Sequence, residues 1–252
     1  GITGLNIEVP FLKGLLDKVG ITAEFYARHE YKNAAASFLN SAFTPQYREE
    51  TERLGQSLYD RIVADVCADR KLDENIFRRL VNRAPLSADE GLKEGLIDKT
   101  AFKPDLLEKV LDETKGEMID VYDYAYSLEE SGKKLPTIAF LVVDGTISGG
   151  KSLSNPLQGE SIVGSETLIQ QLDEIANNEY GKALLLRINS PGGSYTASAE
   201  IWNALSRLKE KRKLPIVVSM GDYAASGGYF IALPGDKILA EASTVTGSIG
   251  VL

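Results

Sequence analysis

The hydrophobic positions in the first half of the chain recur with the period of an α-helix. A long amphipathic helix is predicted over residues 47–69, because four apolar positions repeat there every fourth residue: Leu54, Leu58, Ile62 and Val66. Shorter helices are expected over residues 75–82 and 103–113. A short strand is predicted over residues 21–27, where apolar and aromatic residues follow a glycine.

The pattern changes after residue 136. Residues 137–143 form a continuous apolar run, which is typical of a strand that is buried on both faces. Further apolar runs at residues 183–188 and 215–220 indicate two more buried strands. Helical patterns separate them, at residues 165–177 and 196–211. Strands that alternate with helices predict a parallel sheet with right-handed crossovers, so the expected fold class is α/β.

Composition narrows the function classes. Acidic residues outnumber basic ones, 36 to 28, and the net charge of −8 argues against a partner that presents a phosphate backbone. No apolar run approaches the roughly 20 residues that a membrane-spanning helix needs. The one cysteine, Cys67, continues an apolar helical spacing and is expected to be a buried thiol.

A glycine-rich segment follows the predicted strand at residues 183–188. Residues 189–194 read Asn-Ser-Pro-Gly-Gly-Ser, and paired glycines at such a place let backbone N–H groups approach a ligand closely. Either an oxyanion hole or a phosphate cradle would use this geometry, although the segment lacks the Gly-Lys-Ser/Thr of a P-loop. A plain Pro-Gly turn is the alternative interpretation.

A second candidate segment follows the strand at residues 215–220. Small residues surround Ser226 at a strand-to-helix junction, where free N–H groups of the helix would suit an anionic tetrahedral intermediate. Ser226 could equally be an N-cap, a position that serine favours. The segment is not Gly-x-Ser-x-Gly, because Ala224 stands at the first glycine position, so the α/β-hydrolase elbow is not matched.

A nucleophilic serine needs a base. The only histidine, His29, lies in a charged stretch and is expected at the surface. Lys32 is the other candidate, since it follows the predicted strand at residues 21–27 and opens an uncharged helical stretch. A lysine at a helix N-terminus has its pKa lowered by the macrodipole, and only a neutral lysine accepts a proton. An exposed, charged lysine is the alternative.

Together these segments closely resemble the signal peptide peptidase A family, also called protease IV. The resemblance covers nearly the whole chain, and its most specific pieces are residues 31–34, 189–194, 220–229 and 246–250. It implies a Ser/Lys dyad with Ser226 as nucleophile and Lys32 as general base. It also implies that Ser248 hydrogen-bonds the lysine amine, and that the oxyanion donors are the backbone N–H groups of Gly192, Gly193 and Gly227. No metal or cofactor is expected.

The resemblance also implies a domain organisation. Family members have a Clp-protease-like (crotonase-like) fold, and the long form carries two tandem copies. Residues 1–130 are expected to be the C-terminal part of the first copy, and residues 131–252 the N-terminal part of the second. A similarity between residues 2–7 and residues 245–250 fits that arrangement. The chain is therefore expected to be a fragment of a longer protein.

The function implied by the resemblance is a serine endopeptidase that degrades cleaved signal peptides and other short hydrophobic peptides. The longer protein is expected to be anchored in the inner membrane on its extracytoplasmic side and to form a homo-oligomer, a tetramer, whereas this chain alone is expected to be soluble. Nucleic acid is not an expected partner. Two alternatives keep the fold: a crotonase-type acyl-thioester enzyme, and a catalytically inactive fragment of the assembly.

Overall fold

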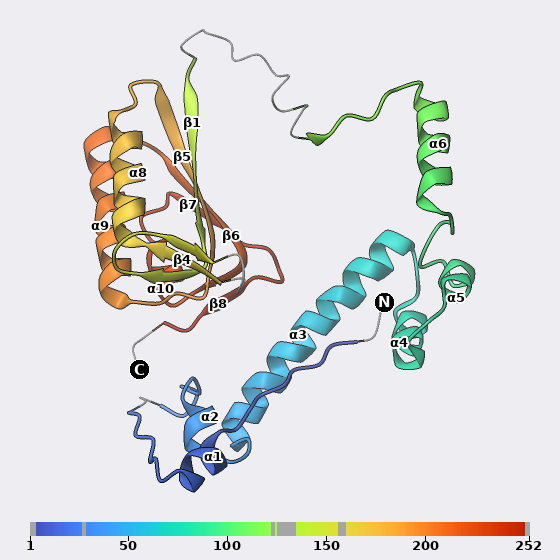
Figure 1. Cartoon of the computed structure of the whole chain (residues 1–252), viewed down its shortest axis with the longest axis horizontal. Coiled ribbons are helices and arrows are strands. Elements are labelled where there is room, and N and C mark those ends of the chain that lie inside the picture. Colours follow the sequence, from blue (N-terminus) through green and yellow to red (C-terminus); the bar gives the residue numbers. More distant parts are fainter. Residues whose placement is uncertain (1–3, 27–28, 122–123, 125–134, 156–159, 250–252) are drawn as a thin grey trace. The chain divides into compact units, whose positions relative to one another are not determined.

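The computed structural model describes residues 4–26, 29–121, 124, 135–155 and 160–249. The chain divides into two compact units, residues 1–131 and 132–251 (Figure 1). The assignment of residues 1–130 and 131–252 to parts of two tandem copies stays a prediction. None of the helices in these described ranges combines the length and the apolar character that crossing a membrane requires.

The described part of the first unit is built from helices and connecting segments. Its helices are α1 (Lys13–Lys18), α2 (Ala36–Leu39), α3 (Pro45–Arg70), α4 (Glu74–Arg83), α5 (Ala88–Lys93) and α6 (Lys103–Thr114). The predicted helices over residues 47–69, 75–82 and 103–113 are confirmed as α3, α4 and α6. The start of α3 is fixed by Thr44, whose hydroxyl accepts a hydrogen bond from the Tyr47 N–H.

The small core of the first unit lies between α3 and α4. Its buried members are Val63, Cys67, Phe77 and Val81. The apolar stripe predicted for α3 is wrong in part, because Leu54 and Ile62 are 43% and 41% exposed. Helix α4 packs only against the C-terminal half of α3, on the face that carries Val63 and Cys67, so it covers a neighbouring stripe rather than the predicted one.

The strand predicted over residues 21–27 is not formed. Residues 21–26 have no regular secondary structure, and residue 27 lies outside the described residues. A strand needs a neighbour to satisfy its N–H and C=O groups, and β-propensity alone supplies none.

The second unit is an α/β layer structure. Its strands are β1 (Thr137–Asp144), β2 (Thr146–Ser148), β3 (Leu153–Asn155), β4 (Glu160–Gly164), β5 (Gly181–Ser190), β6 (Ile216–Ala225), β7 (Lys237–Leu239) and β8 (Val245–Gly247). Its helices are α8 (Ser165–Asn177), α9 (Tyr195–Arg212) and α10 (Gly227–Phe230). The main sheet has the order β1-β5-β6-β7, β8 also pairs with β6, and all of these pairs are parallel. A smaller sheet has the order β2-β4-β3.

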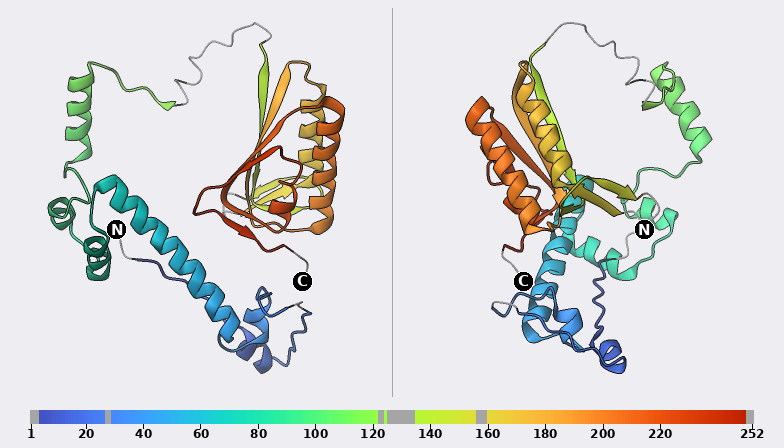
Figure 2. Two further views of the ribbon diagram at one scale, coloured as in Figure 1. Left: turned by 180° about the vertical axis from the view of Figure 1, so that it is seen from behind. Right: turned by 60° about the vertical axis from the view of Figure 1, so that its left-hand side comes forward.

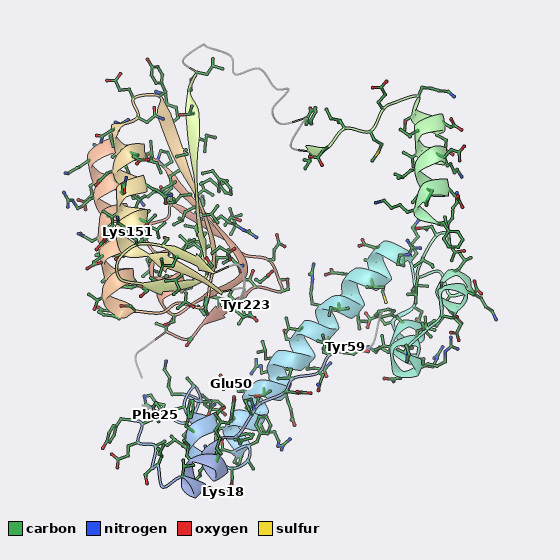
Figure 3. All side chains as sticks on the ribbon, viewed as in Figure 1. Lys18, Phe25, Glu50, Tyr59, Lys151 and Tyr223 are labelled. Atoms are coloured by element: carbon green, nitrogen blue, oxygen red, sulfur yellow. The ribbon has the colours of Figure 1, made fainter. Side chains whose placement is uncertain are left out.

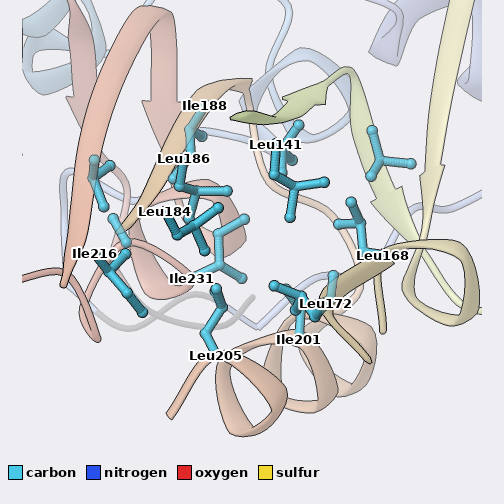
Figure 4. Packing of buried hydrophobic residues seen from close by; sticks show 14 of the residues in the cluster. Leu141, Leu168, Leu172, Leu184, Leu186, Ile188, Ile201, Leu205, Ile216 and Ile231 are labelled. Atoms are coloured by element: carbon cyan, nitrogen blue, oxygen red, sulfur yellow. The ribbon is translucent and has the colours of Figure 1, made fainter. Parts of the chain in front are cut away.

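Helices α8 and α9 lie side by side on one face of the main sheet (Figures 1 and 2). Between them and the sheet lies a continuous apolar core, shown in Figure 4. Its largest fully buried members include Leu168, Leu172, Leu184, Leu186, Ile188, Ile201, Leu205 and Ile216. Burial of each such side chain contributes about 1.5–3 kcal/mol, so this layer fixes the sheet whose strand ends carry the site described below.

The predicted α/β class, with a parallel sheet and flanking helices, is confirmed, but the prediction that β1 is buried on both faces is wrong. Leu141 and Val143 are buried, whereas Ile138, Phe140 and Val142, which point to the opposite face, are 68%, 63% and 46% exposed. The helices of the second unit cover only the face that carries Leu141 and Val143, so every second side chain of this apolar run stays open.

Candidate active site

The candidate site lies where two neighbouring strands of the second unit, β5 and β6, end. Strand β5 ends at Ser190, a glycine turn follows, and α9 begins at Tyr195. Ser194 caps α9 by accepting a hydrogen bond from the Ala197 N–H at 3.3 Å. Strand β6 ends at Ala225, directly before Ser226 and α10. The carboxyl ends of parallel strands meet at one edge of a sheet, so both segments reach the same edge.

The glycine turn is tied to β2. The Ile147 N–H donates to the carbonyl of Gly192 at 2.8 Å, and the Ser194 N–H donates to the carbonyl of Ile147 at 2.9 Å. Gly193 lies between these bonds with φ +147°, and a Cβ there would overlap the carbonyl of Ile147. Only glycine fits this position. The segment is therefore not a simple Pro-Gly turn, because it is extended and hydrogen-bonded to β2 on both sides of Gly193.

Gly192 places this turn against the candidate nucleophile. Its φ is +101°, and a Cβ built on it would lie 2.7 Å from the Gly227 nitrogen and 2.8 Å from both Ser226 Cβ and the Ala225 carbonyl oxygen. The backbone of the turn therefore packs directly on the Ser226 segment. The structure thus brings Gly192, Gly193, Ser226 and Gly227 together.

Ser226 has an unusual backbone conformation, with φ 50° and ψ −118°. Its N–H donates to the Gly247 carbonyl at 2.8 Å, and its carbonyl accepts from the Phe230 N–H at 2.9 Å. The side chain makes no capping hydrogen bond to α10, which removes the N-cap interpretation. Ser226 is half-buried. A strained backbone that is held by hydrogen bonds at both its N–H and its carbonyl is typical of a functional position.

Helix α10 is held against α9 by aromatic rings. Phe230 stacks on Tyr195 and on Trp202, with ring centroids 5.8 Å apart in each pair and interplanar angles of 5° and 16°. Offset stacking of this kind adds about 0.5–1.5 kcal/mol per pair beyond the buried area. The first turn of α10, which includes Gly227, is thereby fixed relative to the glycine turn.

The three glycines predicted as oxyanion donors differ in their N–H groups. The Gly192 N–H donates to Oγ of Ser190, a fully buried side chain, at 3.1 Å. Gly227 is the first residue of α10, where a helical N–H has no intrahelical acceptor. Gly192 therefore contributes close packing, and its N–H is already used inside the turn.

Ser248 is connected to the Ser226 segment through the backbone of its neighbour Gly247. It directly follows Gly247, whose carbonyl accepts the Ser226 N–H. Gly247 and Ser248 both have positive φ, +96° and +49°, so the backbone turns sharply as it leaves β8. Ser248 is exposed.

Lys32 belongs to the first unit and is half-buried. The prediction that it opens a helix is wrong: α2 begins only at Ala36, so the macrodipole argument does not apply to Lys32. The neighbours of Lys32 are anchored on the first turns of α3, since Tyr31 Oη donates to Glu49 at 3.0 Å and Asn33 Nδ2 donates to Glu50 at 2.6 Å. Figure 3 labels Glu50 on α3.

His29 and Cys67, the two other side chains considered in the sequence, lie outside the candidate site. His29 is exposed, as predicted. Cys67 is buried, as predicted, and burial together with the charges of Glu74 and Asp73 raises the pKa of its thiol. Among the described residues, no group of three or more His, Cys, Asp or Glu side chains could hold a metal ion.

Sequence reasoning missed the side chains of Asn189 and Ser190. Ser190 receives the Gly192 N–H, and the Asn189 carboxamide bonds both to Asp144 and to the backbone of Tyr223. Their position in the sequence was the available signal. Both lie at the end of a buried strand, shortly before the paired glycines, where a short polar side chain reaches the neighbouring backbone.

Comparison with known proteins gives a consistent result. The model of peptidase family S49 matches residues 1–116 and 208–252, which include Lys32 and Ser226. "Protease 4" of Salmonella typhi is 32% identical over 96% of this chain and 40% of its own length. "Putative signal peptide peptidase SppA" of Enterococcus faecium is 38% identical over 49% of this chain and 35% of its own length. The chain therefore spans about two fifths of the length of the Salmonella relative.

Among solved structures, a mutant of the 1510-N membrane-bound stomatin-specific protease is similar to part of the chain. The TM-score is 0.35 and the sequence identity 20%, and the match covers 47% of this chain and 50% of that one.

Proposed function

The chain belongs to peptidase family S49, and on that basis we propose that it supplies both members of a Ser/Lys active site, Ser226 as nucleophile and Lys32 as general base. The proposed activity is that of a serine endopeptidase acting on cleaved signal peptides and other short hydrophobic peptides at the membrane. The family match supports the proposal because its two matched segments carry these two residues.

The observation that carries the proposal is the backbone around Ser226. Its N–H donates to the Gly247 carbonyl, its φ is 50°, the glycine turn packs against it, and its side chain does not cap α10. An N-cap serine would use its hydroxyl on the helix, whereas a nucleophile must keep it available for a substrate and a base.

The proposed mechanism begins with proton transfer. Lys32, as the general base, takes the proton of the Ser226 hydroxyl, and Oγ attacks the carbonyl carbon of a peptide bond. The backbone N–H groups of Gly193 and Gly227 stabilise the oxyanion that forms, while Ser248 orients the lysine amine. The Lys32 ammonium then gives its proton to the leaving amine, and an acyl-enzyme on Ser226 remains. Water, deprotonated by Lys32, hydrolyses the ester and restores both groups.

Several further features are proposed for the whole protein. We place it at the inner membrane on the extracytoplasmic side, as a membrane-anchored homo-oligomer, a tetramer. A printed name among its relatives, a putative signal peptide peptidase, supports the substrate class. The net charge of −8 suits peptide substrates better than nucleic acid.

The test is peptidase turnover of the full-length protein on an apolar fluorogenic peptide. Ser226→Ala and Lys32→Ala should each lower kcat by about 10³-fold or more, and the double variant should be no worse than either, because nucleophile and base act as one unit. Ser243→Ala and Lys18→Ala are matched controls at exposed positions and should leave kcat unchanged. Near-normal turnover by either active-site variant, with native circular dichroism, would refute the dyad.

A further inference from the structure

Strand β6 contains an irregular bulge of three residues just before the candidate nucleophile. Ile188 of β5 pairs with Met220 of β6, and the next pair is Ser190 with Ala224. One residue of β5, Asn189, therefore faces three residues of β6, at positions 221–223. A bulge of this kind sets the register of everything that follows it, and Ser226 comes only three residues after its last member.

The side chain of Asn189 fills this bulge. Its Oδ1 accepts a hydrogen bond from the Tyr223 N–H at 3.2 Å, and its Nδ2 donates to Asp144 Oδ1 at 2.9 Å. Only one orientation of the amide satisfies both neighbours, because the backbone N–H requires an acceptor and the carboxylate a donor. The carboxamide thus connects the ends of β1, β5 and β6.

Gly221 and Thr244 close the bulge from the other side. A Cβ on Gly221 would lie 3.1 Å from Cβ and Oδ1 of Asn189, so the side chain packs directly on the Gly221 backbone. The Thr244 hydroxyl donates to the Gly221 carbonyl at 2.8 Å. The first residue of the bulge is therefore fixed by two side chains, and its last residue by Asn189.

The residues that follow the bulge connect it to Ser226 and pair with β8. Tyr223, which Figure 3 labels at the edge of the second unit, pairs with Val245 of β8, and Ala225 pairs with Gly247. The Gly247 carbonyl then accepts the Ser226 N–H. Asn189 holds the start of this paired stretch and lies three residues before Gly192, which packs on Ser226. One side chain thus links both backbones that meet at the nucleophile.

We propose that Asn189 is a positioning residue: its carboxamide fixes the 221–223 bulge of β6 and through it the placement of Ser226 Oγ against the glycine turn. The proposal rests on the nucleophilic role proposed for Ser226. Asn189 itself touches neither substrate nor base in this assignment. Its loss should therefore lower kcat and leave KM nearly unchanged, because a misplacement of about 1 Å in a reacting group costs on the order of 10²-fold.

The test exchanges the two ends of one hydrogen bond in the full-length protein. Asn189→Asp keeps the acceptor for Tyr223 but sets a carboxylate against Asp144, and should lower kcat by about 10–10²-fold. Asp144→Asn alone retains an acceptor for Asn189 and should keep kcat within about threefold of the unchanged protein. The double variant restores a donor and an acceptor in reversed order and should recover most of the loss.

The same series of variants separates the two proposals. Turnover that is lost in Ser226→Ala but unchanged in Asn189→Asp overturns the positioning role alone, as does a double variant no more active than Asn189→Asp. Turnover that persists in Ser226→Ala overturns the proposed function. A loss in Asn189→Asp that appears only in the melting temperature, with kcat per folded molecule unchanged, assigns Asn189 a purely structural role and also overturns the proposal.

Discussion

Replacement of Gly192 by alanine is the most specific perturbation of the site that the structure offers. The position has φ +101°, a conformation that residues with a Cβ rarely adopt. The added methyl group would lie 2.8 Å from Ser226 Cβ and 2.7 Å from the Gly227 nitrogen. One methyl group therefore presses on the proposed nucleophile and on one proposed oxyanion donor together.

The size of the effect follows from these distances. Non-bonded carbon atoms prefer a separation of about 3.5–4.0 Å, so the two backbones must move apart by roughly 1 Å. A shift of that size in a catalytic group lowers turnover by about 10²-fold. The unfavourable φ adds about 1–3 kcal/mol of destabilisation. Gly192→Ala should thus lower both kcat and the free energy of unfolding.

Two other glycines separate the causes. Gly150 has φ +80° and Gly149 is not in the left-handed region, and a Cβ on either would meet nothing within 4 Å. Gly150→Ala should cost about 1–2 kcal/mol of stability and leave kcat unchanged, whereas Gly149→Ala should alter neither. The measurements are peptidase kcat and chemical unfolding of each full-length variant. If Gly192→Ala matched Gly150→Ala in kcat, the close approach of the turn to Ser226 would have no catalytic role.

Two further predictions concern the second unit. Leu205→Ala should destabilise it by about 3 kcal/mol, because Leu205 is fully buried in the core, while Leu233→Ala, at a half-exposed position, should cost less than about 1 kcal/mol in the same unfolding assay. The hydrogen bond from the Ile216 N–H and the ion pair with Lys209 lower the pKa of Asp236. The charged carboxylate therefore stabilises the fold at pH values above the ordinary carboxyl pKa. This contribution to stability is lost as the pH falls through the lowered pKa. Asp236→Asn should therefore lower the melting temperature at pH 7, with a difference that shrinks below about pH 4, and a constant difference would contradict this reasoning.

The sequence predicted the long elements of the fold well, because their patterns are local. Helix α8 spans the predicted residues 165–177, β5 contains the predicted run at residues 183–188, and β6 begins one residue after the start of the run predicted at residues 215–220. The short strands β2, β3 and β4 carry too few residues for a period to be visible. Whether β1 is covered on one face or two depends on which helices pack on the sheet, and a single apolar run contains no such information.

The candidate site was predictable only in its residue types. Ser226 and the paired glycines were found by their place after buried strands, and the structure brings Ser226, Gly192, Gly193 and Gly227 together. The role of Asn189 depends on a bulge in another strand, β6. This bulge is visible only in the pairing register of β5 and β6, which the sequence does not give. The prediction of a helix that begins at Lys32 was wrong, because Ala34 and Ala35 form a turn and the helix begins only at Ala36.

The most direct measurement for the central claim is the site and rate of covalent labelling by a serine-directed fluorophosphonate. The full-length protein is labelled, digested, and the modified residue identified by mass spectrometry, with Lys32→Ala treated in parallel. The account predicts one adduct, on Ser226, formed at least about 10²-fold more slowly without Lys32. An adduct on another serine, or an equal rate in Lys32→Ala, would contradict it.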